Sequence, residues 1–347
     1  MRKKILTAKL LAKAISLAFV AGCSSGSHLT PAPQSAEPYS LPRGPDSVSR
    51  APEAMNPGTQ VHSWVSDAAA VTTADFVSDF NNEDVDIINP KTKALIGQIK
   101  GLSNPEGLAS NPAGTGKNLY EVDQGTQSIH VYAPPYTGTP KIIPDTNFFA
   151  IGIHVDSHGN IFVANQSSGG GSGNGNAIEY VHGSTTHKVL PGGPAAVEFV
   201  TVDSKGNVWG DGFNSLQQPE IGYWPLVSGT YHTFRKQPIA LKYPGGLAFD
   251  NKGNLLLDDQ QGAANLGSII HVYAPGKFTP SRSITIQTNG SQIETFALHD
   301  AENEIIAANT THGYVKLISY PSGSPLGFYF PPVGVFIGSA SIPEPGP

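Results

Sequence analysis

The 347-residue chain contains a single cysteine, Cys23, and only 14% charged residues. One cysteine excludes an intramolecular disulfide framework. The sequence also lacks a nucleophile-elbow serine, a metal-spaced Cys/His set and a dinucleotide-binding fingerprint, so no motif assigns a reaction. No sustained helical period follows residue 72, which argues against a helical domain.

Positive charge is also scarce. The chain has 21 basic and 27 acidic residues, and five of the basic ones lie in the first 23 positions. The remainder therefore has 16 basic against 27 acidic residues, a formal charge of −11. Without a basic cluster, the chain lacks the electrostatic signature of a nucleic-acid-binding protein.

The first 23 residues predict an export signal. A basic head precedes the short apolar stretch 14–22, which is too short to span a bilayer as a mature helix. Val20-Ala21-Gly22-Cys23 resembles the bacterial lipobox, which implies that Cys23 is acylated and becomes the new N-terminus. The alternative is a plain signal peptide that is cleaved nearby. Because the acidic domain would be repelled by anionic headgroups, we expect the lipid to be the membrane anchor.

Residues 24–70 are expected to form a tether, because the stretch to about residue 56 is rich in Pro, Ser, Ala and Gly. Ser24 follows the cysteine, which in two-membrane bacteria usually implies the outer membrane. We therefore expect an exported, lipid-anchored protein of the cell envelope. Residues 343–347 are expected to be a short tail.

A repeated unit dominates the rest of the chain. His-Val-Tyr-Ala-Pro occurs at 130–134 and 271–275. Asp-x-x-Gly-Asn begins at Asp156, Asp203 and Asp250, and looser versions begin at Asn111 and Asp300. These five anchors are 45, 47, 47 and 50 residues apart, which indicates a repeat architecture.

Each unit contains four short runs that are rich in β-branched and aromatic residues and separated by turn residues. In one unit these runs are 246–249, 254–258, 268–273 and 281–286. Four strands per unit, at a period in the mid-forties, predict one blade of a β-propeller.

The two ends of the repeat region predict how the ring closes. The first unit has only three strands, at 74–79, 85–88 and 94–100, and lacks its first strand. Residues 332–338 match that missing strand. We therefore predict an all-β fold over residues 71–342: a six-bladed propeller closed by a C-terminal strand that completes the N-terminal blade.

The units resemble NHL-type repeats and the wider group of six-bladed propellers that includes gluconolactonase-like and virginiamycin-B-lyase-like enzymes. The resemblance covers about residues 71–340 and is specific for architecture. It is uninformative about function, because this fold supports hydrolases, lyases and binding modules.

Polar residues recur at the ends of the second strands, where connections meet the channel mouth of a propeller. Aligned units place there Asp79, Asp123, Asn165, Gly212, Asp259 and Asn309. Such oxygen ligands suit Ca²⁺ or another divalent cation, and the resemblance to gluconolactonases implies such a metal. The competing interpretation is that Asp and Asn bond to their own turns. The candidate ligand or metal residues are Glu106, Glu198, Asn165, Asp211 and Asp259.

Other features favour structural roles. His130 and His271 occupy equivalent strand positions, and His154 and His299 lie in or near first strands, so each histidine is expected to be structural. The Gly-rich stretch 167–176 is expected to be a loop, because no helix follows it as a phosphate-binding loop requires.

Two functions follow from these features. The first is a membrane-anchored binding or scaffolding module for a protein, peptide or glycan. The alternative is a metal-dependent hydrolase or lyase of the gluconolactonase-like type.

Overall fold

The structure is a computed structural model. It describes residues 62–66, 73–112, 114–146, 148–168, 173–234, 241–263, 267–286, 292–299, 303–310, 313–329 and 335–342. All of these belong to one compact unit, residues 53–347. Cys23, most of the expected tether and the expected tail 343–347 lie outside the described residues. No helix within the described ranges is long and apolar enough to cross a membrane.

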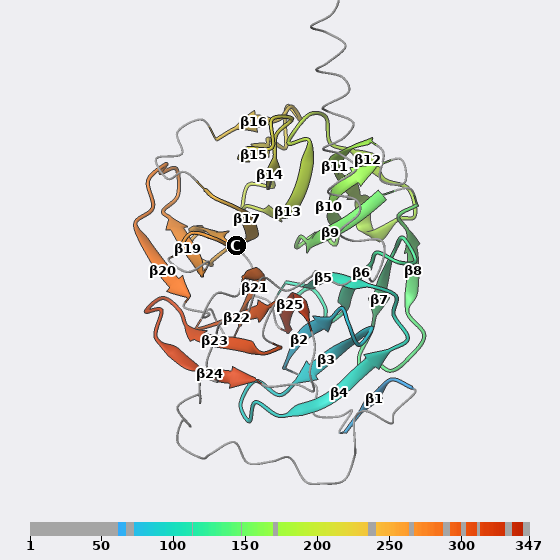
Figure 1. Cartoon of the computed structure of the whole chain (residues 1–347). Coiled ribbons are helices and arrows are strands. Elements are labelled where there is room, and N and C mark those ends of the chain that lie inside the picture. The colour runs from blue at the N-terminus through green and yellow to red at the C-terminus, as the bar shows by residue number, and fades with distance from the viewer. Residues whose placement is uncertain are drawn as a thin grey trace, which may run out of the picture. The chain divides into compact units, whose positions relative to one another are not determined.

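The described chain folds into six antiparallel sheets, which surround a central channel as the blades of a propeller (Figure 1). Blade 1 contains, from the inside outward, β25 (Phe336–Ile342), β2 (Ala74–Asp79), β3 (Asp84–Ile88), β4 (Leu95–Lys100) and β1 (Trp64–Val65). Blade 2 contains β5 (Pro105–Ser110), β6 (Leu119–Asp123), β7 (Ser128–Tyr132) and β8 (Lys141–Pro144). Blade 3 contains β9 (Phe148–Val155), β10 (Ile161–Ser168), β11 (Gly173–Tyr180) and β12 (Lys188–Val189).

The other three blades follow in chain order. Blade 4 contains β13 (Ala196–Val202), β14 (Val208–Phe213), β15 (Pro219–Trp224) and β16 (His232–Thr233). Blade 5 contains β17 (Pro244–Phe249), β18 (Leu255–Asp259), β19 (Ser268–Tyr273) and β20 (Arg282–Ile286). Blade 6 contains β21 (Ile293–His299), β22 (Glu304–Asn309), β23 (Val315–Ser319) and β24 (Pro325–Tyr329). One short 3₁₀ turn, η2 (Val181–Gly183), follows β11.

The ring closes as the sequence predicts. β25, from the C-terminal end of the described chain, pairs antiparallel with β2 and places Ile342 opposite Ala74. It is the innermost strand of blade 1, which is otherwise built from N-terminal residues. The short strand β1 adds a fifth strand at the outer edge of this blade and comes from the range 24–70.

The Asp-x-x-Gly-Asn motif forms the hairpin between the first and second strands. In blade 3, Asp156 Oδ1 accepts the backbone N–H of His158 and of Asn160, while Asp156 Oδ2 accepts the Asn160 side-chain amide. Gly159 adopts φ +76°, a left-handed conformation that glycine takes without a steric penalty. Asp203 and Asp250 make the same set of hydrogen bonds, which explains the sequence repeat.

The hydrophobic core is divided among the seams between blades. Each of the six clusters of buried apolar residues combines side chains of two adjacent blades, and the cluster of Val77, Phe336 and Ile306 joins blade 6 to blade 1. At that same seam His299 Nδ1 lies 2.9 Å from Asp75 Oδ1, and both side chains are buried. Burial at every seam makes the ring a single cooperative unit.

Candidate functional site

Glycines bring the six first strands close together around the channel. Gly107, Gly152, Gly246 and Gly338 occupy equivalent positions in four of them, and each faces the backbone of the next blade. A Cβ on Gly152, for example, would lie 2.6 Å from the carbonyl oxygen of Glu198. Only residues without a side chain permit so close an approach, so these positions fix the channel's narrow section.

A β-bulge interrupts every first strand just before this narrow section. In blade 2, Pro105 pairs with Asp123, and pairing resumes only at Leu108. The first bulge residue is glutamate in alternate blades: Glu106, Glu198 and Glu294, in blades 2, 4 and 6. In the other blades it is Ile151, Gly245 and Ile337. Bulges redirect side chains, and the charges of Glu198 and Glu294 act on Glu106, so the three carboxylates face a common region.

The three glutamates influence one another electrostatically. Glu106 is 6% exposed, and none of the described residues hydrogen-bonds its carboxylate. Burial, and then the charges of Glu294, Glu198 and Glu121, raise the pKa of Glu106 well above its usual range. Burial raises the pKa of Glu198 to about 7, although Gln166 Nε2 donates a hydrogen bond of 3.1 Å to its Oε1. Burial and Glu198 raise the pKa of Glu294.

Of two aspartates in the second strands, Asp211 lies near Glu198, and Asp258 lies near Asp211. Asp211 Oδ1 accepts the backbone N–H of Phe199 at 3.1 Å, and its buried Oδ2 has no hydrogen-bond partner. Burial, and then Glu198 and Asp258, raise the pKa of Asp211 well above its usual range. Asp258 Oδ2 lies 2.6 Å from where a Cβ of Gly245 would stand, so it takes the space of the missing bulge side chain in blade 5. We call these five residues the carboxylate ring: Glu106, Glu198, Glu294, Asp211 and Asp258.

The sequence-derived candidates thus separate into two groups. Glu106, Glu198 and Asp211 belong to the carboxylate ring. Asp259, by contrast, accepts the backbone N–H of Lys242 and of Tyr243, which precede the first strand of its blade.

Equivalent aspartates make equivalent contacts. Asp79 accepts N–H groups of Asn81, Asn82 and Val335. The turn-bonding interpretation therefore describes Asp79 and Asp259 well. Asn165 donates to Asn176 Oδ1 at 3.0 Å and keeps a buried oxygen without a partner. It precedes Gln166, whose amide holds Glu198.

Sequence reasoning missed Glu294 and Asp258. Glu294 stands in Ile-Glu-Thr-Phe, which lacks the glycine that follows Glu106, so its equivalence to Glu106 appears only from the bulge register. The position of Asp258 depends on Gly245, which leaves room for its carboxylate. Glu106, Glu198 and Glu294 each directly follow a residue that pairs near the end of the second strand. This shared register is the signal that would have identified Glu294.

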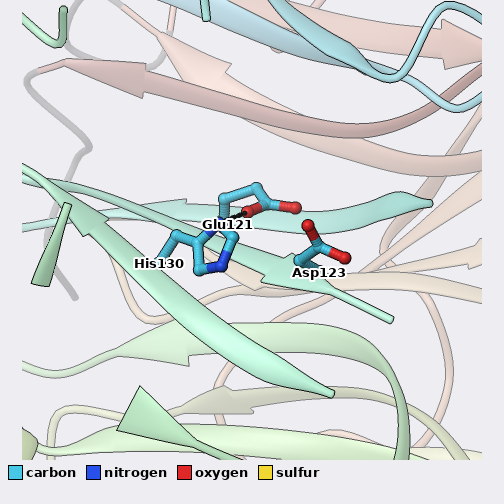
Figure 2. Close-up of side chains that lie close together, drawn as sticks. All are labelled: Glu121, Asp123 and His130. Atoms are coloured by element: carbon cyan, nitrogen blue, oxygen red, sulfur yellow. Dashed lines mark ion pairs between the residues drawn. The ribbon is translucent and has the colours of Figure 1, made fainter. Parts of the chain in front are cut away.

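A second cluster of polar side chains lies within blade 2 (Figure 2). Glu121 Oε2 is 3.1 Å from His130 Nδ1, and ligand atoms of Glu121, Asp123 and His130 all lie within 4.8 Å of one another. Within the described ranges, no other three His, Cys, Asp or Glu residues meet this criterion. Figure 2 shows Asp123 beside this pair, on the same strand as Glu121.

Hydrogen bonds hold Asp123 and His130 in this cluster, while Glu121 contacts His130. Asp123 accepts the backbone N–H of Ser103 at 2.8 Å and of Thr126 at 3.0 Å, while His130 Nε2 contacts Ser128 Oγ at 3.0 Å. Burial would lower the pKa of His130, but Glu121 raises it overall, as expected for a buried ion pair. The cluster is therefore an ion pair beside a turn, in agreement with a structural histidine.

The channel contains a cavity with a mixed lining, which includes His154, Thr201 and Ser339 beside apolar residues. It encloses about 50 Å³, and its lining includes Phe199, Leu247, Phe249 and Phe296. His154 lies in the same lining, and burial lowers its pKa to about 4, so its imidazole is neutral at physiological pH. The channel thus combines a strongly acidic section with an uncharged wall.

Comparisons with known proteins agree with this architecture. No family model matches the chain, and no curated protein matches it significantly in sequence. A chain in the crystal structure of a nidogen–laminin complex is similar in structure, with a TM-score of 0.62 and 15% identity over 78% of this chain and 98% of that one. A gluconolactonase from Xanthomonas campestris gives a TM-score of 0.53 and 14% identity, over 68% of this chain and 79% of that one.

These likenesses define a class of protein. The described chain is a six-bladed β-propeller, of the same fold as a chain of a nidogen–laminin complex and as a gluconolactonase. At such low identity, the similarity establishes the fold alone.

Proposed function

We propose that this protein is an exported, lipid-anchored β-propeller that binds a positively charged ligand in its carboxylate ring. The observation that supports this most directly is that Glu106, Glu198 and Glu294 occupy the same bulge position in alternate blades and act on one another electrostatically. Among the described residues, no lysine, arginine or histidine forms an ion pair with any member of the ring. Buried carboxylates without a counter-charge are costly, and a bound cation would offset that cost.

The acidic character of the carboxylate ring is better explained by a bound ligand than by a purely structural role. Turn-bonding aspartates such as Asp259 are satisfied by several backbone N–H groups. Asp211 Oδ2, by contrast, is buried and has no hydrogen-bond partner among the described residues. Native proteins rarely leave buried polar groups unsatisfied, and those that they do leave are frequently functional.

The proposed attachment of the protein to the membrane is supported by the sequence. Cys23 in its lipobox-like setting supports acylation, and the tether would hold the propeller away from the membrane, in the outer membrane where the cell has two. In that location the channel face would meet a protein, peptide or glycan that carries the positive group. Metabolic labelling with radioactive palmitate should mark the wild type and leave Cys23→Ala unlabelled; equal labelling of both would refute the anchor.

Thermal unfolding tests the binding site. We would use the chain from residue 23 onward with Cys23→Ser, after EDTA treatment, and add Ca²⁺, Mg²⁺ or alkylamines. Saturation at a hundred times Kd stabilises by about 2.7 kcal/mol, which raises Tm by about 5–11 °C in a domain of this size. Glu106→Gln should abolish the rise and the exposed control Glu83→Gln should retain it. No rise with any cation would sink the proposal.

A metal-dependent hydrolase or lyase is the second candidate. Unpartnered carboxylate oxygens are ligands that Ca²⁺ prefers, and Glu198, whose pKa is about 7, would serve as a proton donor or acceptor. The ring fits a directly coordinated ion less well, because no three of its ligand oxygens lie within 4.8 Å of one another. Lactone hydrolysis that requires Ca²⁺ and disappears in Glu106→Gln would favour this candidate.

A further inference from the structure

We propose that Glu121, Asp123 and His130 of blade 2 bind a divalent transition-metal ion such as Zn²⁺. In the absence of a metal, these side chains form the ion pair and the turn contacts described above. The site goes beyond the proposed function, because none of the three residues belongs to the carboxylate ring. Its support comes from an unusual buried charge, from the spacing of the side chains and from an oxygen without a partner.

Glu121 stands at a position that carries no charge in any other blade. It lies two residues before Asp123 in the second strand of blade 2. The corresponding residues of the other five second strands are Val77, Val163, Gly210, Leu257 and Ala307. Leu119 belongs to the core between blades 1 and 2, and alternate residues of a strand share a face, so Glu121 faces that same seam. A carboxylate at a core position costs folding free energy, and a bound cation would offset this cost.

Blade 5 shows that the histidine alone does not define the site. His271 is the equivalent of His130, because both stand in the repeated His-Val-Tyr-Ala-Pro phrase. The residue opposite His271 on the second strand is Leu257, whereas Glu121 stands opposite His130. His271 Nδ1 instead contacts Ser283 Oγ at 2.9 Å. The carboxylate that faces the imidazole is therefore specific to blade 2, as expected for a functional departure from the repeat.

The spacing of the three side chains suits a tetrahedral ion. Glu121 Oε2 and His130 Nδ1 are 3.1 Å apart. Two ligand atoms at about 2.0–2.1 Å from Zn²⁺ lie about 3.3 Å apart at the tetrahedral angle, so this pair already has nearly the required separation. Ligand atoms of all three residues lie within 4.8 Å of one another, so a movement of about 1.5 Å brings Asp123 into the third position. An imidazole ligand favours a transition metal over Ca²⁺ and Mg²⁺, which prefer oxygen.

A buried oxygen without a partner points into the site. Glu121 is 0% exposed, and its Oε1 has no hydrogen-bond partner among the described residues. Figure 2 shows one carboxylate oxygen of Glu121 facing His130 and the other on the side of Asp123. One imidazolium carries a single positive charge, which cannot neutralise two buried carboxylates. A divalent ion would supply the missing charge and a partner for Oε1.

Neighbouring polar groups hold these side chains as the outer shell of a metal site does. Ser128 Oγ contacts His130 Nε2 at 3.0 Å, and with the proton on Nε2 the lone pair of Nδ1 is left for a metal. Asp123 Oδ2 accepts the N–H of Ser103, and Asp123 Oδ1 accepts that of Thr126. Each of these oxygens keeps a further lone pair for a metal. Thr126 is exposed, so an ion can reach the site from this turn.

Isothermal titration with Zn²⁺ tests the inference on the Cys23→Ser chain, which lacks the only thiol, after EDTA treatment and dialysis. One Zn²⁺ should bind per chain. Glu121→Gln keeps the size of the side chain and should weaken binding at least about a hundredfold, since even the loss of an outer-shell partner costs about 10–100-fold. Ser128→Ala should show that smaller loss, and the matched control His271→Gln should bind Zn²⁺ as the wild type does. Equimolar Ca²⁺ or Mg²⁺ should not displace Zn²⁺.

Other outcomes separate this site from the carboxylate ring. X-ray absorption at the zinc edge should show one imidazole nitrogen among oxygen ligands. Equal Zn²⁺ affinity in Glu121→Gln would assign the ion to surface histidines and overturn the inference, as would the absence of Zn²⁺ binding. Binding that Glu106→Gln abolishes and Glu121→Gln retains would place the ion in the carboxylate ring, which overturns this inference and supports the proposed function. If urea unfolding showed that Glu121→Gln does not fold, Asp123→Asn, which keeps an acceptor oxygen, would test the same loss of affinity.

Discussion

Replacing Glu198 with glutamine should make the propeller more stable at alkaline pH, which is unusual for the loss of a native side chain. Glu198 is 4% exposed, and burial raises its pKa from 4.5 to about 7. Between these two values the folded state holds a proton that the unfolded state has released. Stability therefore falls as pH rises through this window, and it is lowest above pH 7.

The magnitude follows from the same two values. A carboxyl that titrates at about 7 when folded and at 4.5 when unfolded costs about 3 kcal/mol of folding free energy at pH 8. Glutamine keeps the size of the side chain and its contact with Gln166 but carries no charge. At pH 8, without added cations, Glu198→Gln should gain up to about 3 kcal/mol, or about 6–12 °C in Tm, and at pH 5 the gain should fall below about 1 kcal/mol.

Urea unfolding at pH 5 and pH 8 in the presence of EDTA measures both quantities. Glu83→Gln is the matched control, because Glu83 is exposed, and its stability should follow the wild type at both values of pH. If Glu198→Gln lost stability at pH 8, or if the wild type were more stable at pH 8 than at pH 5, the assignment of a buried, uncompensated carboxylate would be wrong.

Two further substitutions test the surroundings of the ring. Gly152→Ala should destabilise by about 1–3 kcal/mol in urea unfolding, because its Cβ meets the Glu198 carbonyl, and Gly138→Ala, in open space, is the control. If Gly152→Ala and Gly138→Ala destabilised the protein equally, the close contact between Gly152 and the next blade would be contradicted. Asp123→Ala should cost about 2 kcal/mol through lost bonds to Ser103 and Thr126, but should leave the affinity of the carboxylate ring for its cation unchanged. If Asp123→Ala folded but lost its affinity for the cation, we would conclude that Asp123 is a ligand of that cation.

The fold could be predicted from the sequence because its repeat is a local structure. Asp156, Asp203 and Asp250 each organise a hairpin within five residues, so the motif marks blade after blade. The closing strand could also be predicted, since an N-terminal unit without its first strand requires one from elsewhere. β-Strand patterning in 74–79 and 332–338 located both partners to within a few residues.

The site could be predicted only in part, because it depends on register between strands. Glu106 and Glu198 are candidates from the sequence, and the structure places both at the bulges of first strands. Glu294 shares their bulge, yet its neighbouring residues do not resemble theirs. Asp258 reaches the ring only because Gly245 has no side chain. A side chain that occupies the space left by a glycine of another strand leaves no pattern along the chain.

The position of β25 also constrains the order in which the protein matures. The innermost strand of blade 1 is made more than 250 residues after its partner β2, counting from Asp79 to Phe336. Until that strand arrives, β2 presents an open edge and the channel lacks one of its six walls. A chain that enters an export channel N-terminus first would thus stay incompletely folded, and hence threadable, until the translocation of its final blade. If the protein is exported as proposed, closure would occur on the far side of the membrane, where β25 would pair with β2.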